Sequence, residues 1–193
     1  SPSDVALGAS GTLYVADSGN HTIRQVTSAG VVTTLAGVAD AQGSADGDAN
    51  TARFNNPKGI TTDATGKIYV SDTTNNTIRA ITLNPVSVTT LAGLSGVTNS
   101  SAVIHSSTLA GLYSNAPTAD RRIDLEPALG NILLNGPTGL IADGAQSLRV
   151  ADTGNASILD VNITQSSATR TGLEGVAGHR DGTSPMFTGP RDV

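Results

Sequence analysis

The chain of 193 residues repeats itself three times, and this repetition constrains its fold more than any other feature. Three segments align without gaps and begin at Pro2, Pro57 and Pro137. In each segment an Asp follows the Pro by fifteen residues, an Asn follows that Asp by three, and an Ile follows it by six. A shorter match, PRDV at residues 190–193, resembles the PSDV at the start of the first segment. Matched positions at so long a period indicate repeated supersecondary units.

Each repeat is predicted to form four short strands. In the first repeat we place them at residues 4–7, 13–16, 22–26 and 31–35, which are rich in Val, Ile, Leu, Tyr and Thr and are separated by Gly, Ser, Asn and Asp. Helical periodicity is absent except in a short piece near residues 119–129. Four strands in roughly 40 residues are typical of the blades of an all-β propeller.

The spacing of the repeats divides the propeller segment, residues 1–193, into blades. We place blade 1 at about residues 1–37, blade 2 at about 57–93, blade 3 at about 137–178 and the start of a fourth blade at 190–193. The excess length between the second and third repeats falls in an insertion at residues 94–136. An insertion between blades emerges on a face of the propeller, either as a surface loop or as a docking element for a neighbouring subunit.

Several motifs resemble the NHL-repeat β-propellers. They are LYVADSGNHTIR at 13–24, IYVSDTTNNTIR at 68–79, the VTTLAG closures of the first two repeats, and ADGDANTARFNNP between these repeats. The resemblance implies a larger, typically six-bladed ring, of which three four-stranded blades and the start of a fourth are seen here. The ring would be closed by more of the same chain or by other chains, or it would remain an open arc capped by partners.

The third repeat departs from this pattern. Leu159 stands where the first two repeats have Arg24 and Arg79, and SSATRTGLEGVAG replaces the VTTLAG closure. We therefore predict that the outer strand of blade 3 is irregular.

The Asp and Asn of each repeat are interpreted as structural. Asp17, Asp72 and Asp152 each precede a polar turn, where Asp and Asn side chains bind nearby backbone N–H groups. A position repeated in every blade belongs to the fold more often than to a site. We expect Arg24 and Arg79 to pair with acidic groups or carbonyls between blades.

No catalytic or metal-binding set is identified, and no cofactor is expected. Three aspartates after blade 1 superficially resemble a calcium loop but lack its terminal Glu and its spacing: Asp40, Asp46 and Asp48. Some NHL-like propellers are lyases that hold zinc with histidines of the central channel. The three histidines here occupy unlike positions, which argues against a shared zinc: His21, His105 and His179.

Composition excludes several classes of partner. The formal net charge is −5 and only 3% of residues are aromatic, which opposes binding to nucleic acid, including the RNA binding of some NHL domains. No run of eighteen apolar residues is present, so membrane insertion is not expected. Without Cys, the chain has neither disulfides nor thiolate ligands.

Five Asn-x-Ser/Thr sequons indicate a glycosylated protein that is extracellular or on the cell surface: Asn20, Asn75, Asn99, Asn155 and Asn162. We expect a non-enzymatic scaffold or assembly module, with N-glycans and with protein partners that include copies of itself or further propeller blades. The alternative is a ligand-binding sensor or metal-dependent lyase whose site lies in blades outside this sequence.

Overall fold

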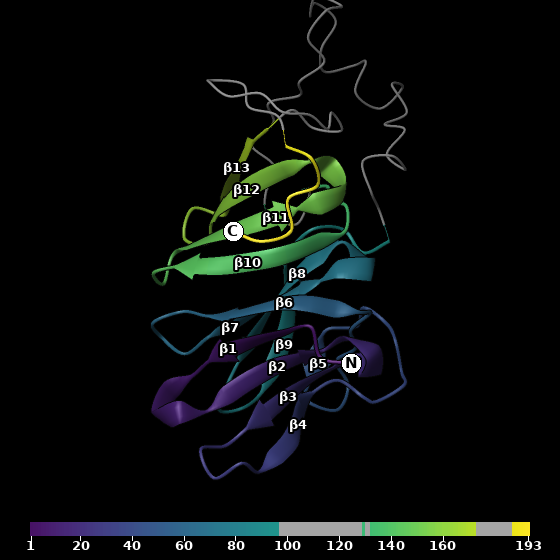
Figure 1. The fold of residues 1–193 in the computed structure, drawn as a ribbon, viewed down its shortest axis with the longest axis vertical. Helices are drawn as coiled ribbons and strands as arrows, with labels where there is room; N and C mark the ends of the chain where they lie inside the picture. The colour runs from purple at the N-terminus through teal and green to yellow at the C-terminus, as the bar shows by residue number, and fades with distance from the viewer. Residues whose placement is uncertain (97–128, 130–131, 173–186) are drawn as a thin grey trace, which may run out of the picture.

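The computed structural model describes residues 1–96, 129, 132–172 and 187–193, and within them the chain forms three antiparallel sheets (Figure 1). The insertion at 94–136 is therefore described only at its ends and at residue 129. Within the described residues the assigned helices are three-residue 3-10 turns, and none of them could cross a membrane.

Each sheet contains one repeat, whose four strands follow one another in chain order across the sheet. Blade 1 contains β1 (Asp4–Leu7), β2 (Leu13–Asp17), β3 (Thr22–Val26) and β4 (Val32–Ala36). Blade 2 contains β6 (Pro57–Thr62), β7 (Ile68–Asp72), β8 (Thr77–Thr82) and β9 (Ser87–Ala92). Blade 3 contains β10 (Pro137–Asp143), β11 (Ser147–Asp152), β12 (Ser157–Asn162) and β13 (Ser167–Thr171).

The connection between the second and third strands of each blade is a tight 3-10 turn. These turns are η2 (Ser18–Asn20), η3 (Thr73–Asn75) and η5 (Thr153–Asn155). The residue after each turn has a positive φ near 55°, at His21, Asn76 and Ala156. A further turn, η1 (Ala9–Gly11), joins β1 to β2.

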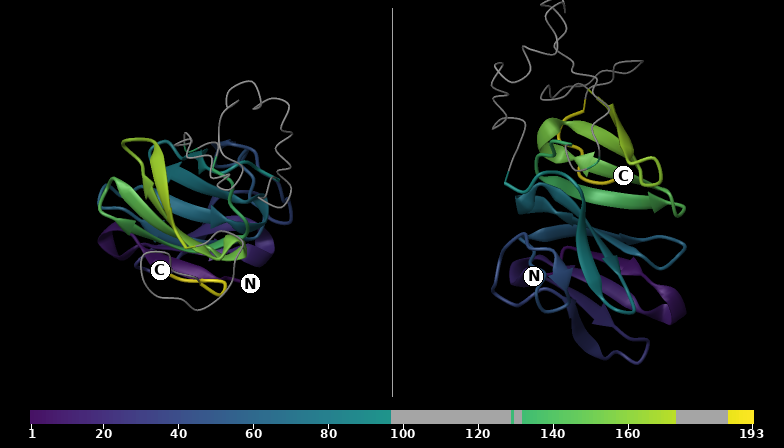
Figure 2. Two further views of the ribbon diagram at one scale, coloured as in Figure 1. Left: turned by 90° about the horizontal axis from the view of Figure 1, so that it is seen from above. Right: turned by 180° about the vertical axis from the view of Figure 1, so that it is seen from behind.

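The sheets stack face to face as propeller blades. Their first strands β1, β6 and β10 lie side by side in Figure 1, with blade 1 at the bottom and blade 3 at the top, and the view from behind in Figure 2 shows the same order. Gly59 makes the close approach of β6 to β10 possible, because a Cβ there would lie 2.1 Å from the carbonyl oxygen of Thr138. The predicted all-β propeller fold is confirmed.

The hydrophobic core lies between the blades. One cluster joins blade 1 to blade 2 and includes Tyr14, Ile23 and Ile68, while a second joins blade 2 to blade 3. The linker before a blade contributes to the same interfaces, through the fully buried side chains of Phe54 and Leu134, each three residues before a repeat's Pro.

A hydroxyl group links each blade to the next at the same position. The residue after the repeat's Asp donates a hydrogen bond to the carbonyl of the next repeat's Pro: Ser18 to Pro57, Thr73 to Pro137 (2.6 Å) and Thr153 to Pro190 (2.5 Å). Residues 190–193 thus begin a fourth unit with the same contact.

Two details differ from the expectations. Blade 2 gains a fifth strand, because β5 (Gly47–Asp48) of the preceding linker pairs with β9. The predicted irregularity of the outer strand of blade 3 is wrong: β13 pairs with β12 over five residues without a register shift, whereas the outer pairs of blades 1 and 2 each contain a bulge. The sequence SATRT alternates well enough to pair, although it shares little with VTTLAG.

Candidate functional site

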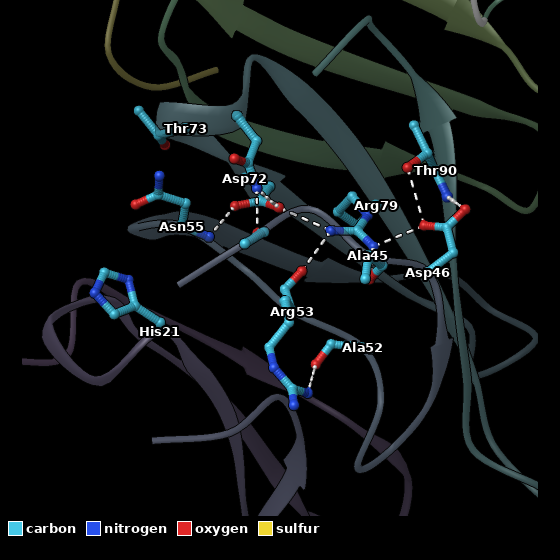
Figure 3. A network of polar contacts seen from close by, with 12 residues as sticks. His21, Ala45, Asp46, Ala52, Arg53, Asn55, Asp72, Thr73, Arg79 and Thr90 are labelled. Atoms are coloured by element: carbon cyan, nitrogen blue, oxygen red, sulfur yellow. Dashed lines mark hydrogen bonds and ion pairs between the residues drawn. The ribbon is translucent and has the colours of Figure 1, made fainter. Parts of the chain in front are cut away.

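The repeated Asp, Asn and Arg form a buried cluster in blade 2, of which Figure 3 shows Asp72 and Arg79. Asp72 ends β7, Asn75 lies in η3, and Arg79 lies in the adjacent β8. The Asp72 carboxylate accepts hydrogen bonds from Asn75 Nδ2 at 2.7 Å and from Arg79 Nη1 at 2.9 Å on the same oxygen. Its other oxygen accepts the backbone N–H of Asn55 at 2.7 Å. The cluster therefore ties the linker before blade 2 to the blade itself.

The Arg79 guanidinium binds the same linker. It donates to the carbonyl oxygens of Arg53 at 2.8 Å and Ala45 at 2.9 Å, and to the Asp46 carboxylate at 2.7 Å. Asp46 in turn accepts the backbone N–H and the hydroxyl of Thr90 on β9, both at 3.0 Å. Arg79 is fully buried, and its guanidinium lies 5.2 Å from the centre of the Phe54 ring.

Both oxygens of Asp72 and both terminal nitrogens of Arg79 are used within the protein, whereas the buried Nε of Arg79 has no hydrogen-bond partner among the described residues. Burial raises the pKa of the Asp72 carboxyl, while the hydrogen bonds from Asn55, Asn75 and Arg79 act in the opposite direction. A buried carboxylate and guanidinium that bind each other in this way stabilise the fold. Neither oxygen of Asp72 is directed to a substrate. The expectation that Arg79 pairs with acidic groups and carbonyls agrees with this geometry.

Blade 3 builds the same cluster with a different arginine. Asp152 binds Asn155 Nδ2 at 2.8 Å and the backbone N–H of Asn135 at 2.8 Å, as in blade 2. Leu159 fills the position of Arg79, and Arg170 on β13 donates to Asp152 at 2.5 Å and to the carbonyl of Leu133 at 3.0 Å. Arg170 is the direct cross-strand partner of Leu159. Sequence reasoning missed Arg170 because it looked for the arginine at the repeat position rather than on the paired strand.

In blade 1 the cluster is open. Asn20 Nδ2 donates to Asp17 at 2.7 Å, and Arg24 donates to the hydroxyl of Thr34 at 2.5 Å. Asn20 and Thr34 are exposed and Arg24 is half-buried. The N-terminal amine of Ser1 lies 3.7 Å from Asp17.

The five sequons fall into different environments. Asn75 and Asn155 are 7% and 2% exposed, and each amide nitrogen donates two hydrogen bonds, one to the repeat's Asp and one to a linker carbonyl. A glycan on either nitrogen does not fit this fold, which corrects the expectation of a glycan at each repeat. Asn20 is exposed and Asn162 is half-buried, while Asn99 lies outside the described residues. The glycosylation prediction is thereby narrowed to Asn20, Asn99 and Asn162.

The residues considered for metals have other roles where they are described. Nδ1 of His21 accepts the backbone N–H of Asn56 at 3.0 Å across the junction of blades 1 and 2. Asp48 accepts hydrogen bonds from Asn50 and from Thr51 within its own turn, and these lower the pKa of its carboxyl. In the described part of the chain no three His, Asp or Glu side chains are placed so that they could hold a metal ion together, and Asp40 therefore belongs to no such group. His105 and His179 lie outside that part.

One face of blade 1 exposes a row of apolar side chains, which we call the open face: Val5, Leu7, Leu13 and Val32, at 54, 67, 37 and 52% exposure. Leu7 pairs with Leu13, and Val26 pairs with both Leu13 and Val32, so these side chains lie on the same side of the sheet. Three exposed positions have buried counterparts in blade 2, where Ile60, Ile68 and Val88 are 3, 0 and 0% exposed. In blade 2 this face packs against blade 1.

Sequence comparisons agree with this architecture. The family model described as "NHL repeat" matches residues 1–26 and 54–81, which cover much of blade 1 and the first three strands of blade 2. Protein SUPPRESSOR OF QUENCHING 1, chloroplastic, of Arabidopsis thaliana is 37% identical over 84 residues, which are 43% of this chain and 8% of the plant protein.

Two solved structures show the same fold over a longer chain. A Bacteroides thetaiotaomicron protein of unknown function has a TM-score of 0.67 at 16% identity, covering 99% of this chain and 41% of its own. The virginiamycin B lyase of Staphylococcus aureus has a TM-score of 0.50 at 16% identity, covering 88% of this chain and 40% of its own. The chain therefore spans about two fifths of the length of these two structures.

Proposed function

We propose that the chain, whose propeller blades resemble NHL repeats, acts as a non-enzymatic scaffold that assembles with a further propeller blade through the open face of blade 1. The observation that carries this proposal is the exposure of Val5 and Leu13 at positions whose counterparts are buried against a preceding blade, namely Ile60 and Ile68 in blade 2 and Leu140 and Leu148 in blade 3.

The physical reason is the energy of apolar burial. An exposed row of Val and Leu on one sheet face costs free energy in water, at about 25 cal/mol for each Å² left uncovered. The blade that covers Ile60 and Ile68 presents Ala6, Tyr14 and Ile23, all buried at that interface. A further blade with a similar small and aromatic face fits the open face of blade 1 in the same way.

We further propose that the protein works outside the cell or at its surface and carries N-glycans. Support comes from the exposed sequon at Asn20 and from the half-buried one at Asn162, whose side chain accepts the backbone N–H of Gln165 in a turn. Glycosylation needs an accessible acceptor of this kind. The mass of the native protein before and after enzymatic glycan removal tests this part, and an unchanged mass contradicts it.

Sedimentation of the chain over a range of concentrations tests the assembly. With its open face uncovered, the chain is expected to self-associate and to bind an apolar dye. The double variant Leu7→Ser, Leu13→Ser should reduce both. Val38→Ser is the matched control, because Val38 is an exposed valine outside the sheet of blade 1.

Equal self-association of the double variant and the unchanged chain contradicts the scaffold proposal. So does stoichiometric zinc in the purified protein together with lyase activity. That result would favour the alternative of a metal-dependent lyase. The likeness of this chain to the virginiamycin B lyase extends to the fold alone.

A further inference from the structure

We propose that Asn135 is a site of spontaneous deamidation, and that the junction of blades 2 and 3 controls this modification. The junction consists of η3 and Asn76 of blade 2 together with residues 133–137, which lead into blade 3. While the junction is closed, Asn135 reacts slowly. Once Asn135 has reacted, the junction cannot close as before. This inference goes beyond the proposed function and does not depend on it.

The sequence places Asn135 directly before Gly136, and this is the one Asn-Gly pair in the 193 residues. In such a pair the backbone nitrogen of the Gly attacks Cγ of the Asn side chain. The amide nitrogen of that side chain leaves as ammonia, together with the N–H proton, and a cyclic imide joins Cγ to the Gly nitrogen. Water then opens the imide at either carbonyl and yields aspartate or isoaspartate. Gly favours the attack because it has no side chain to obstruct the approach.

The attacking nitrogen is held by blade 2. Gly136 donates its backbone N–H to Oδ1 of Asn76 at 2.8 Å. Asn76 is only 7% exposed, so water does not readily replace this hydrogen bond. The imide nitrogen carries no hydrogen, and the reaction therefore cannot proceed without loss of the bond to Asn76. A closed junction slows the attack for this reason.

Blade 3 holds the rest of Asn135. The backbone N–H of Asn135 donates to Asp152 Oδ1 at 2.8 Å, and its carbonyl oxygen accepts the N–H of Gly154 at 2.8 Å. The side chain lies against the same turn, because a Cβ added at Gly154 would lie 2.5 Å from Cγ of Asn135. The nucleophile is thus bound to blade 2, while the carbon that it attacks is packed against blade 3.

Both products change the junction. Isoaspartate adds a methylene group to the backbone between residues 135 and 136, so the N–H groups of these residues can no longer reach Asp152 and Asn76 together with the same geometry. Aspartate keeps the backbone but adds a negative charge to the residue that binds the Asp152 carboxylate. The modification therefore records that the junction has opened, and it weakens the junction afterwards.

The junction of blades 1 and 2 provides a comparison within the same chain. Asn55 and Asn56 occupy the equivalent positions there. Asn55 donates its N–H to Asp72 at 2.7 Å, and Asn56 donates its N–H to Nδ1 of His21 at 3.0 Å. The two N–H groups are thus held in the same way, but Asn56 carries a side chain that obstructs attack on Asn55. We expect the reaction at Asn135 and not at Asn55.

Ageing of the full chain in mildly alkaline buffer tests the proposal, with proteolysis and mass spectrometry to measure deamidation at each Asn. A free peptide of residues 132–140, ILLNGPTGL, gives the rate without the fold. The folded chain should react at Asn135 at least about tenfold more slowly than the peptide, because the reaction must wait for local opening. In the aged chain, modification should appear at Asn135 before any appears at Asn55.

Variants of Asn76 test the control by blade 2. Asn76→Ala should raise the rate at Asn135 about fivefold, because it removes the acceptor of the Gly136 N–H. Ala156 adopts the same left-handed conformation in blade 3, so Ala fits the position. Asn76→His should keep the rate close to that of the unchanged chain, because His21 accepts the equivalent N–H between blades 1 and 2.

Thr73→Ala tests the junction without a change to either reacting group. It removes the hydroxyl that binds the Pro137 carbonyl and should also raise the rate at Asn135 by about fivefold. The matched control is Thr74→Ala, at an exposed position of the same turn, and it should leave the rate unchanged.

Four results would overturn the proposal. They are equal rates in the folded chain and the peptide, an Asn76→Ala variant that reacts no faster than Asn76→His, a Thr73→Ala variant that reacts no faster than Thr74→Ala, and modification of Asn55 ahead of Asn135.

Discussion

Replacement of Arg79 by Leu tests whether the buried cluster holds blade 2 to its linker. Leu is the residue that blade 3 has at the equivalent position 159, so the side chain suits a propeller strand. The change removes the guanidinium's bonds to Asp72, to Asp46 and to two linker carbonyls. It also leaves Asp72, which is fully buried, without its cation.

The expected cost follows from that uncompensated carboxylate. Removal of one partner from a buried ion pair costs about 3–5 kcal/mol. For a chain of this size each kcal/mol lowers Tm by about 2–4 °C, so Arg79→Leu should lower Tm by roughly 6–20 °C. Arg24→Leu in blade 1, where the arginine is half-buried, should cost no more than about 1 kcal/mol.

Blade 3 also provides a rescue variant. Because Arg170 is paired with Leu159 as Thr90 is paired with Arg79, the double variant Arg79→Leu, Thr90→Arg transfers the arrangement of blade 3 to blade 2. Calorimetric melting of the three variants is the assay, and the double variant should recover part of the lost Tm. A Tm loss for Arg79→Leu no larger than that for Arg24→Leu, or a double variant that melts no higher than Arg79→Leu, would refute the reasoning.

Three further changes test other parts of the fold. Gly59→Ala should destabilise the chain by about 1–3 kcal/mol in urea melts, because the new Cβ would lie 2.1 Å from the Thr138 carbonyl oxygen. The control Lys58→Ala, at an exposed position, should change stability by less than about 0.5 kcal/mol. Equal effects of the two changes would contradict the close packing of β6 and β10. Thr73→Ala should cost about 1–2 kcal/mol by removing the hydroxyl bound to the Pro137 carbonyl, and an unchanged melting curve would show that this contact does not stabilise the junction. Burial and the Asp63 carboxylate raise the pKa of Tyr69, so its contribution to stability is complete below the unfolded-state pKa of about 10 and is lost as pH rises toward the folded-state pKa. Tyr69→Phe should therefore make the free energy of unfolding fall less steeply with pH in alkaline solution. An unchanged dependence of that free energy on pH above about 10 would contradict this.

The fold could be predicted from the sequence because each repeat independently predicts the same four-stranded unit. The alternation of apolar residues and the polar turns recur in register, so the predicted strands at 4–7 and 22–26 coincide with β1 and β3. The recurrence of the Asp and Asn positions predicts a structural role, but the expected bonds to N–H groups of the turn are not the ones formed. Asp72 and Asp152 accept the backbone N–H of linker residues Asn55 and Asn135 instead.

Contacts between distant segments could not be predicted in this way. Arg170 takes the role of an arginine at position 159 because the strand register places it opposite Leu159. Asn75 and Asn155 are buried because linkers fold over them. The sequons at Asn20 and Asn75 look alike in the sequence but differ in exposure, because residues 43–55 cover Asn75 and no described linker covers Asn20. Such coverage is a tertiary property that a local pattern does not encode.

Hydroxyl-radical footprinting of the open face tests the central claim most directly. Leu7, Leu13 and Val32 are exposed in the chain of residues 1–193 and should be oxidised there. In the native protein from its source, with its partner blade in place, we expect strong protection of these three side chains and unchanged oxidation of the exposed Val38. Equal oxidation of Leu7, Leu13 and Val32 in both samples would contradict the claim that another blade covers blade 1.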